Sequence, residues 1–423
     1  MLDPKLFLLT ECENVSRLLS NTLRYAYSSA SSAEVYGECL ARLRIIRSRI
    51  RGARAEDTDR LNELSIHLSK LSQLIGRVER SHIEEFSWPF AAALEDLARR
   101  VCSTEQGDAT PLFFISADDE LFSYQIRTEE DDPGLMERPL FNIIFPRSLK
   151  HFALLHPILG HEVGHAAYAI PSLGAALESS VTRILVSGSA LDDFTKFAEW
   201  AAASGTDLDA DESTQAVLSW PEEFYCDLFG LLLMGPSYIG ANHTLLLGLQ
   251  DLSDTHPGSL TRCWAIAHAI DVMGWSSIDC DPESRLGRAV AAFFGKLRAT
   301  AEAVPDNLRL LKPANVRQAT VALADILRKK GVLFETPNAD LLERLTESLL
   351  RGCPPVATTV TESLEIFNER VDFRTILYAG WLAWSNKQSA VSDLSFLDIN
   401  MLCDRGLLQQ NAVDHFATWA ERA

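Results

Sequence analysis

The chain contains 423 residues, of which 47% are hydrophobic, 9% aromatic and 23% charged, a composition typical of folded globular proteins. Acidic residues outnumber basic ones by 58 to 39, so the formal net charge at pH 7 is −19. Such a surface repels polyanions, and no nucleic-acid partner is expected. At about 150 residues per domain the length favours two or three domains, which can bury cores without a metal or disulfides.

The cysteines and the apolar segments indicate a cytoplasmic protein. The eight cysteines are scattered without a C-x-x-C pair, which favours reduced thiols, and the N-terminus lacks the pattern of a signal peptide. Residues 228–250 carry no charge, but Gly235 and Pro236 divide them into halves shorter than the roughly 20 residues of a spanning helix. We therefore expect no membrane span, and a buried helical hairpin over 228–250.

The first 104 residues show apolar positions at helical spacing, which predicts two or three long helices. A basic cluster lies within them and is formed by Arg42, Arg44, Arg47, Arg49, Arg51 and Arg54. We interpret it as a solvated helix face paired with acidic neighbours, and the alternative is a site for a partner or a phosphate group.

A short region rich in Phe, Ile and Tyr follows the first helices. Residues 112–116 and 121–126 are predicted to form a hairpin or two neighbouring strands, and residues 141–145 a third strand closed by Pro146. No comparable run follows, so the sheet should be small.

From residue 148 onward the chain reads as successive helices separated by prolines. The expected fold class is α+β and predominantly helical. We divide the chain into a helical N-terminal segment (1–104), a core (105–280) and a helical C-terminal region (281–423). The two flanking regions could bind a protein partner.

The strongest motif is His161-Glu162-Val163-Gly164-His165, an H-E-x-x-H pattern inside an apolar helical run. On a helix, residues four apart lie on one face, so both imidazoles can reach one zinc ion. Glu162 is offset by one residue, which keeps its carboxylate off the metal but close enough to take a proton from zinc-bound water.

A third ligand is expected on a later helix, within Pro221-Glu222-Glu223-Phe224-Tyr225-Cys226-Asp227. Pro221 suits the first turn of a helix. Glu223 and Asp227 share a face, so Glu223 can bind zinc while Asp227 accepts a hydrogen bond from a ligand histidine. Glu222 points elsewhere and is read as a glutamate stabilised by the helix dipole.

These motifs resemble those of the gluzincin zinc metallopeptidases, and more narrowly of the M48 family, in which H-E-x-x-H is followed by E-x-x-x-D. A later His-Pro followed by an arginine, His256-Pro257 and Arg262, resembles a further motif of that family. The resemblance covers about residues 112 to 275 and implies a zincin-like metallopeptidase core with one zinc ion per chain. It also implies that the strand at 141–145 is the edge strand that aligns the substrate.

The sequence departs from the family at several points. Cys226 stands where a small residue is common, the membrane helices of many relatives are absent, and the two flanking regions have no counterpart that we can name.

The expected function is hydrolysis of peptide bonds in a peptide or protein substrate, with zinc held by His161, His165 and Glu223. Glu162 would be the general base, and His256 would stabilise the oxyanion, a role for which Tyr225 and Tyr238 are alternatives. Two other functions stay open, namely a non-catalytic zinc-containing interaction protein and a zinc hydrolase of a non-peptide bond.

Overall fold

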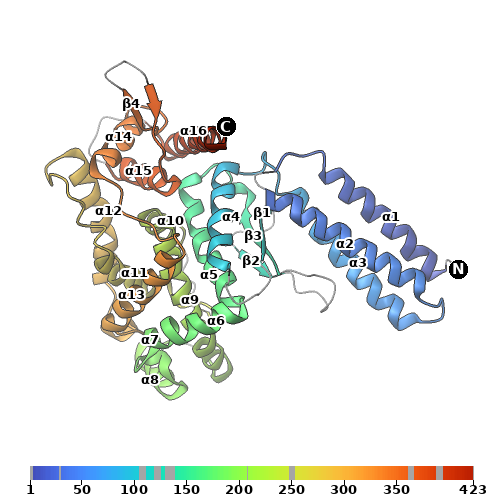
Figure 1. Ribbon diagram of the computed structural model, residues 1–423. Helices are drawn as coiled ribbons and strands as arrows, with labels where there is room; N and C mark the ends of the chain where they lie inside the picture. The colour runs from blue at the N-terminus through green and yellow to red at the C-terminus, as the bar shows by residue number, and fades with distance from the viewer. Residues whose placement is uncertain are drawn as a thin grey trace. The chain divides into compact units, whose positions relative to one another are not determined.

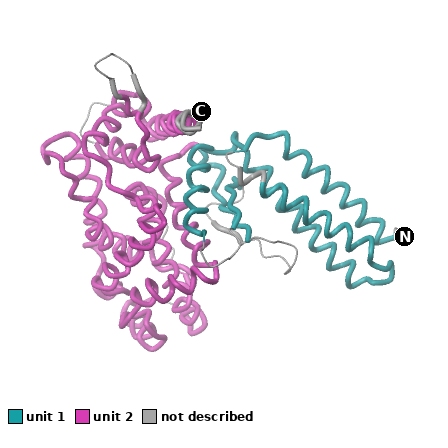
Figure 2. Tube along the Cα trace, viewed as in Figure 1, with its two compact units in different colours: residues 1–150 teal, residues 151–423 magenta. Residues whose placement is uncertain are grey.

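The computed structural model of the chain describes residues 3–27, 30–103, 111–118, 125–128, 139–206, 208–246, 253–360, 366–386 and 394–422. Helices dominate and strands are few and short (Figure 1), which confirms an α+β fold that is predominantly helical. The chain divides into two compact units, Met1–Lys150 and His151–Ala423 (Figure 2). This division does not test the boundaries expected after residues 104 and 280, which stay predictions.

The helices of the first unit outnumber the two or three that the sequence predicts. They are α1 (Pro4–Thr22), α2 (Ala30–Gly52), α3 (Thr58–Glu79) and α4 (Trp88–Cys102). The first three lie side by side as an antiparallel bundle (Figure 1). The buried leucines of α3, among them Leu61, Leu64 and Leu68, recur at helical spacing, so one face of the helix enters the core.

The basic cluster of α2 does not lie uniformly on a solvated face. Arg47 is partly exposed and lies 3.6 Å from the Glu13 carboxylate, as the expected pairing with acidic neighbours requires. Arg42, in contrast, is buried at 2% exposure. The expectation of a solvated face therefore holds for Arg47 and is wrong for Arg42.

The sheet of the first unit has three strands, β1 (Leu112–Asp118), β2 (Gln125–Thr128) and β3 (Leu140–Pro146), in the order β1-β3-β2. β1 is parallel to β3, and β2 is antiparallel to it. The expected hairpin of the first two strands is therefore wrong, although part of that prediction, residues 121–124, lies outside the described residues. The parallel partner and complete burial explain why β3 is apolar apart from Asn142, whose side-chain oxygen accepts a hydrogen bond from the Ser116 hydroxyl.

Because β3 is the central strand, it cannot be the edge strand that the family resemblance implies. Residues Phe141 to Ile144 pair with β2 on one side and with β1 on the other, so their backbone groups have no free edge for a substrate. A substrate strand could add only to β1 or β2.

The second unit is built from helices around α5 (Leu159–Ala169) and α9 (Ala210–Met234). Its other α-helices are α6 (Pro171–Leu177), α7 (Arg183–Val186), α8 (Phe194–Ser204), α10 (Pro236–Leu246), α11 (Ser259–Met273), α12 (Arg285–Glu302), α13 (Pro313–Lys329), α14 (Ala339–Leu350), α15 (Phe373–Asn386) and α16 (Phe396–Arg422). A small antiparallel pair, β4 (Thr358–Val360) and β5 (Ile366–Asn368), contradicts the expectation of no strand after β3. Three-residue strands leave too short a pattern to recognise in sequence.

Glycines allow α5 and α9 to pack closely. A Cβ atom at Gly164 would lie 3.1 Å from the Cα atom of Cys226, and one at Gly230 would lie 2.8 Å from the backbone nitrogen of His161. The contact at Gly230 is shorter than real Cβ atoms show, and the contact at Gly164 would require Cys226 to shift, so both positions favour glycine where the helices approach.

The charge-free segment forms the end of α9 and the helix α10, as the expected hairpin requires, although residues 247–250 of that prediction lie outside the described residues. Gly235 joins them with φ of 65°, in a region that favours glycine. Among the described residues no helix has the length and hydropathy needed to cross a membrane. None of the eight cysteines forms a disulfide bond in the structure.

Candidate metal centre

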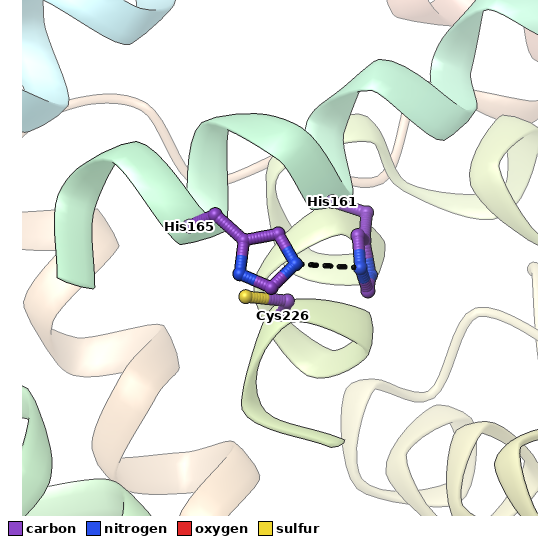
Figure 3. A group of neighbouring side chains, drawn as sticks. All are labelled: His161, His165 and Cys226. Carbon is purple, nitrogen blue, oxygen red and sulfur yellow. Dashed lines mark hydrogen bonds between the residues drawn. The ribbon is translucent and has the colours of Figure 1, made fainter. Parts of the chain in front are cut away.

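Helix α5 presents the two histidines of the H-E-x-x-H motif on one face. The Nε2 atoms of His161 and His165 face each other at 3.1 Å, and both imidazoles project toward α9 (Figure 3). His161 is buried, and the side chain of His165 is 22% exposed. The spacing of four residues thus places two nitrogen donors at one point, as the motif predicts.

Glu223 on α9 adds a carboxylate to the two imidazoles. Its Oε2 atom lies 3.4 Å from Nε2 of His161, and its Oε1 atom lies 3.3 Å from Nε2 of His165. The structure therefore brings the three predicted ligands together. We call His161, His165 and Glu223 the metal centre below.

The start of the Glu223 helix differs from the expectation. Helix α9 begins at Ala210, where Asp209 and Glu212 form a capping box, and Pro221 lies in its interior. The sequence contains this start signal, an aspartate three residues before a glutamate. Pro221 instead predicts a helix start at a later position, and that prediction is wrong.

The outer nitrogens of the two histidines are held by carboxylates of α9. Nδ1 of His161 lies 3.1 Å from Oδ1 of Asp227, and Nδ1 of His165 lies 2.8 Å from Oε1 of Glu222. Carboxylates accept hydrogen bonds, so each Nδ1 acts as the donor and each Nε2 keeps its lone pair. A metal ion that displaces any proton from the Nε2 atoms would meet two lone pairs and the Glu223 carboxylate at one point.

Asp227 is fully buried in a network of its own. Arg262 on α11 donates from Nε to Oδ2 and from an Nη atom to Oδ1, both at 2.7 Å, and the Tyr238 hydroxyl on α10 donates to Oδ1 at 2.7 Å. Although burial alone would raise the pKa of the Asp227 carboxyl, the Arg262 guanidinium holds it well below its usual range. Asp227 is therefore a carboxylate that orients His161.

At Glu223 and His161, as at Asp227, neighbouring charges outweigh the effect of burial on the pKa. Burial opposes ionisation of Glu223, but His161, His165 and Arg262 lower the pKa of its carboxyl well below the ordinary value. Burial also disfavours a charged His161, and Glu223 and Asp227 overcome that effect and raise the pKa of its imidazole. A cation between these groups is thus electrostatically favoured.

The donor set fits a tetrahedral zinc ion. Ligand atoms at about 2.0–2.1 Å from zinc are about 3.3 Å apart in a tetrahedron. The two Nε2 atoms are 3.1 Å apart, and each has a different oxygen of Glu223 nearby, Oε2 at 3.4 Å from His161 and Oε1 at 3.3 Å from His165. Oε2 of Glu223 is buried and makes no hydrogen bond among the described residues. Two neutral imidazoles and one carboxylate are ligands that zinc accepts.

Cys226 offers a second possible donor beside the same histidines. Its Sγ atom and one nitrogen of each histidine lie within 4.8 Å of one another, so His161, His165 and Cys226 could hold a metal ion (Figure 3). Burial raises the pKa of the Cys226 thiol to about 12, although His165 acts against this. We favour Glu223 as the third ligand because its oxygens already face both Nε2 atoms and because it is ionised.

Glu162 lies beside the centre as a carboxylate without a partner. It is 8% exposed, and within the described part of the chain it forms neither an ion pair nor a hydrogen bond. Its position one residue after His161 leaves its oxygens available to accept a proton.

His256 lies near the centre in the loop before α11. Its Nε2 atom is 3.7 Å from Oε1 of Glu223, its side chain is 52% exposed, and Thr255 Oγ1 lies 2.8 Å from its Nδ1. The structure thus brings together His256 and the predicted ligands, while its role stays a prediction. Tyr238, an alternative for that role, uses its hydroxyl on Asp227 instead.

The sequence alone does not reveal the contacts of several residues around the centre. It shows Arg262 only as part of a motif and Cys226 only as a departure from the family, and it predicts that Glu222 is a glutamate at a helix start. The last assignment is wrong, since α9 begins well before Glu222, which instead binds His165. The spacing of four between Glu222 and Cys226 places both on one face and could have linked them.

No family model, curated protein or solved structure matches this chain. The interpretation of the site therefore depends on its own geometry and chemistry.

Proposed function

We propose that the chain is a zinc-dependent metallopeptidase with a zincin-like core and one zinc ion per chain, similar to the gluzincins of the M48 family. The observation that carries this proposal is the convergence of His161, His165 and Glu223, with each histidine oriented from behind by a carboxylate. Three protein ligands leave a position for water or substrate, which is typical of catalytic rather than structural zinc sites.

Bound zinc would polarise a scissile carbonyl group and lower the pKa of water. The residues of the chain supply the rest of the chemistry. Glu162 accepts the proton of the attacking water and delivers it to the leaving amine, and its lack of a partner supports this role. His256, partly exposed beside Glu223, donates a hydrogen bond to the developing oxyanion.

A non-catalytic zinc protein is the second candidate because Cys226 lies beside the histidines. Two histidines, a carboxylate and a thiolate would complete four ligands and close the site to substrate. An unpartnered Glu162 favours the catalytic reading, since a closed site has no use for a general base.

The test compares the wild type with Glu162→Gln in zinc content and in cleavage of a proteome-derived peptide library. We expect about one zinc per chain in both proteins and a loss of most turnover in the variant, because the proton acceptor is removed while the ligands remain. Glu199→Gln on α8, an exposed glutamate, is the matched control and should keep full activity.

Two results would contradict the proposal. A wild type without zinc would remove the metal centre, and cleavage that Glu162→Gln leaves undiminished would remove the general base. Zinc in the wild type without cleavage of any peptide would favour the closed site or another hydrolytic substrate.

A further inference from the structure

Glu222 and Glu223 are adjacent on α9 and address the two nitrogens of a single imidazole. Oε1 of Glu222 lies 2.8 Å from Nδ1 of His165, and Oε1 of Glu223 lies 3.3 Å from Nε2 of the same ring. Consecutive helical side chains point about 100° apart, which lets the two carboxylates approach the ring from different sides.

We propose that Glu222 is a positioning residue of the metal centre, which fixes the tautomer and orientation of His165 so that its Nε2 atom faces the metal. This inference rests on the proposed zinc site. A carboxylate that accepts a hydrogen bond from Nδ1–H keeps that nitrogen protonated, which prevents it from binding the metal and makes the opposite nitrogen more basic. Glu222 would thus do for His165 what Asp227 does for His161.

The two positioning carboxylates differ in their surroundings. Asp227 is fully buried and neutralised by Arg262, whereas the Glu222 side chain is 35% exposed and has His165 as its only ion-pair partner among the described residues. The Glu222 carboxylate therefore makes its direct contact with this imidazole. Its removal leaves Nδ1 of His165 without this partner, but the His165 side chain is 22% exposed and water can replace the carboxylate, so the fold should tolerate substitution.

The test measures zinc affinity of the full chain by competition with a chromophoric chelator. Glu222→Ala should weaken zinc binding by about 10–100-fold, the usual cost of losing such a partner. Glu222→Gln keeps an oxygen that can accept a hydrogen bond from Nδ1–H of His165. The zinc affinity of this variant should therefore lie between those of Glu222→Ala and the wild type. Glu199→Gln removes an equal charge at a distance and should bind zinc like the wild type.

A second readout separates positioning from general destabilisation. In zinc-free protein with ¹⁵N-labelled histidine, at a pH at which the His165 imidazole is neutral, the His165 resonances of the wild type should report a proton on Nδ1, and Glu222→Ala should show a mixture of the two tautomers. The thermal midpoint of zinc-free Glu222→Ala should stay close to that of the wild type.

The outcomes distinguish this inference from the function on which it rests. If the wild type binds zinc and Glu222→Ala binds it within about threefold, the positioning role is overturned while the metal centre stands. An unchanged tautomer of His165 in Glu222→Ala overturns it equally. If the wild type binds no zinc, the proposed function itself fails.

Discussion

Glu223 and Cys226 on α9 are the two candidates for the third metal ligand, and they differ in their protonation state. Glu223 is ionised and faces both Nε2 atoms, whereas burial keeps the Cys226 thiol protonated until a metal displaces its proton. A site that uses Glu223 keeps one position open, and a site that uses both residues does not.

Glu223→Ala should therefore lose most of the bound zinc, while Cys226→Ala should retain about one zinc per chain. Metal content of the dialysed proteins by mass spectrometry checks both expectations. Retained zinc in Glu223→Ala together with its loss in Cys226→Ala would reverse the assignment and favour the structural site.

Arg262 stabilises the fold through Asp227, because the two charges are buried together. Arg262→Leu would leave the Asp227 carboxylate without its guanidinium, and removing one partner of a buried pair costs about 3–5 kcal/mol. Urea unfolding of the zinc-free protein measures this loss. Arg328→Leu, which breaks an exposed pair with Asp325, is the control and should cost less than about 1 kcal/mol.

His256 is partly exposed, so its replacement should affect the reaction rather than the fold. If its imidazole stabilises the oxyanion, His256→Ala should lower kcat by about 10²–10³-fold with little change in KM or zinc content. Steady-state kinetics on a cleaved peptide gives both parameters. A kcat within a few-fold of the wild type would leave the role unassigned, and a loss of zinc would make His256 a support of the metal centre.

At the scale of elements, the metal centre depends on the contact between α5 and α9. The histidines belong to one helix and the carboxylates to the other, so the distances between donors follow from how closely the helices pack. Gly164 and Gly230 set that packing, since no side chain separates the two backbones there.

Gly230→Ala should therefore destabilise the protein and weaken zinc binding together. Its Cβ atom would lie 2.6 Å from the Tyr238 ring and 2.8 Å from the backbone of His161, and overpacking of this kind costs about 1–3 kcal/mol. Gly295→Ala on α12 is the control, because nothing lies within 4 Å of its added Cβ atom. That variant should gain about 0.5–1 kcal/mol, and both values follow from urea unfolding.

Much of this architecture could be read from local patterns. Apolar periodicity predicts the helical bundle and α5, and the spacing of four places His161 and His165 on one face. These features depend on residues within a few turns of one another, which a sequence displays directly.

The features that the sequence did not reveal depend on contacts between distant segments. The central place of β3 follows from its pairing with β1 and β2, and nothing within the strand distinguishes a central strand from a buried edge strand. Glu222 binds His165 only because α5 crosses α9 at that level. Side-chain partners between helices depend on crossing geometry, which short-range patterns do not encode.

At the scale of the whole molecule, the two compact units should respond differently to zinc. The proposed ligands all belong to residues 151–423, so bound zinc would stabilise that unit and leave α1, α2 and α3 of the other unchanged. A ligand at 100 times its dissociation constant adds about 2.7 kcal/mol to the stability of the state that binds it.

Hydrogen exchange with mass spectrometry checks this expectation. Removal of zinc with a chelator should accelerate exchange in peptides from α5 and α9, and peptides from α1 to α3 serve as the internal control. Equal acceleration in all of these helices would show that the two units unfold as one.

The contact between α5 and α9 also predicts which residues homologues of this chain should conserve. Among the described residues, the groups of these two helices that would bind or orient a metal ion lie in two short motifs, H-E-V-G-H and E-E-F-Y-C-D. Selection on the metal centre would preserve these motifs and the glycines where the two helices cross. The sequences of the intervening helices and of both flanking regions would be free to change. Distant homologues of this chain should therefore share the two motifs and little other sequence. The glutamate directly before the proposed ligand glutamate should be the residue that best identifies them.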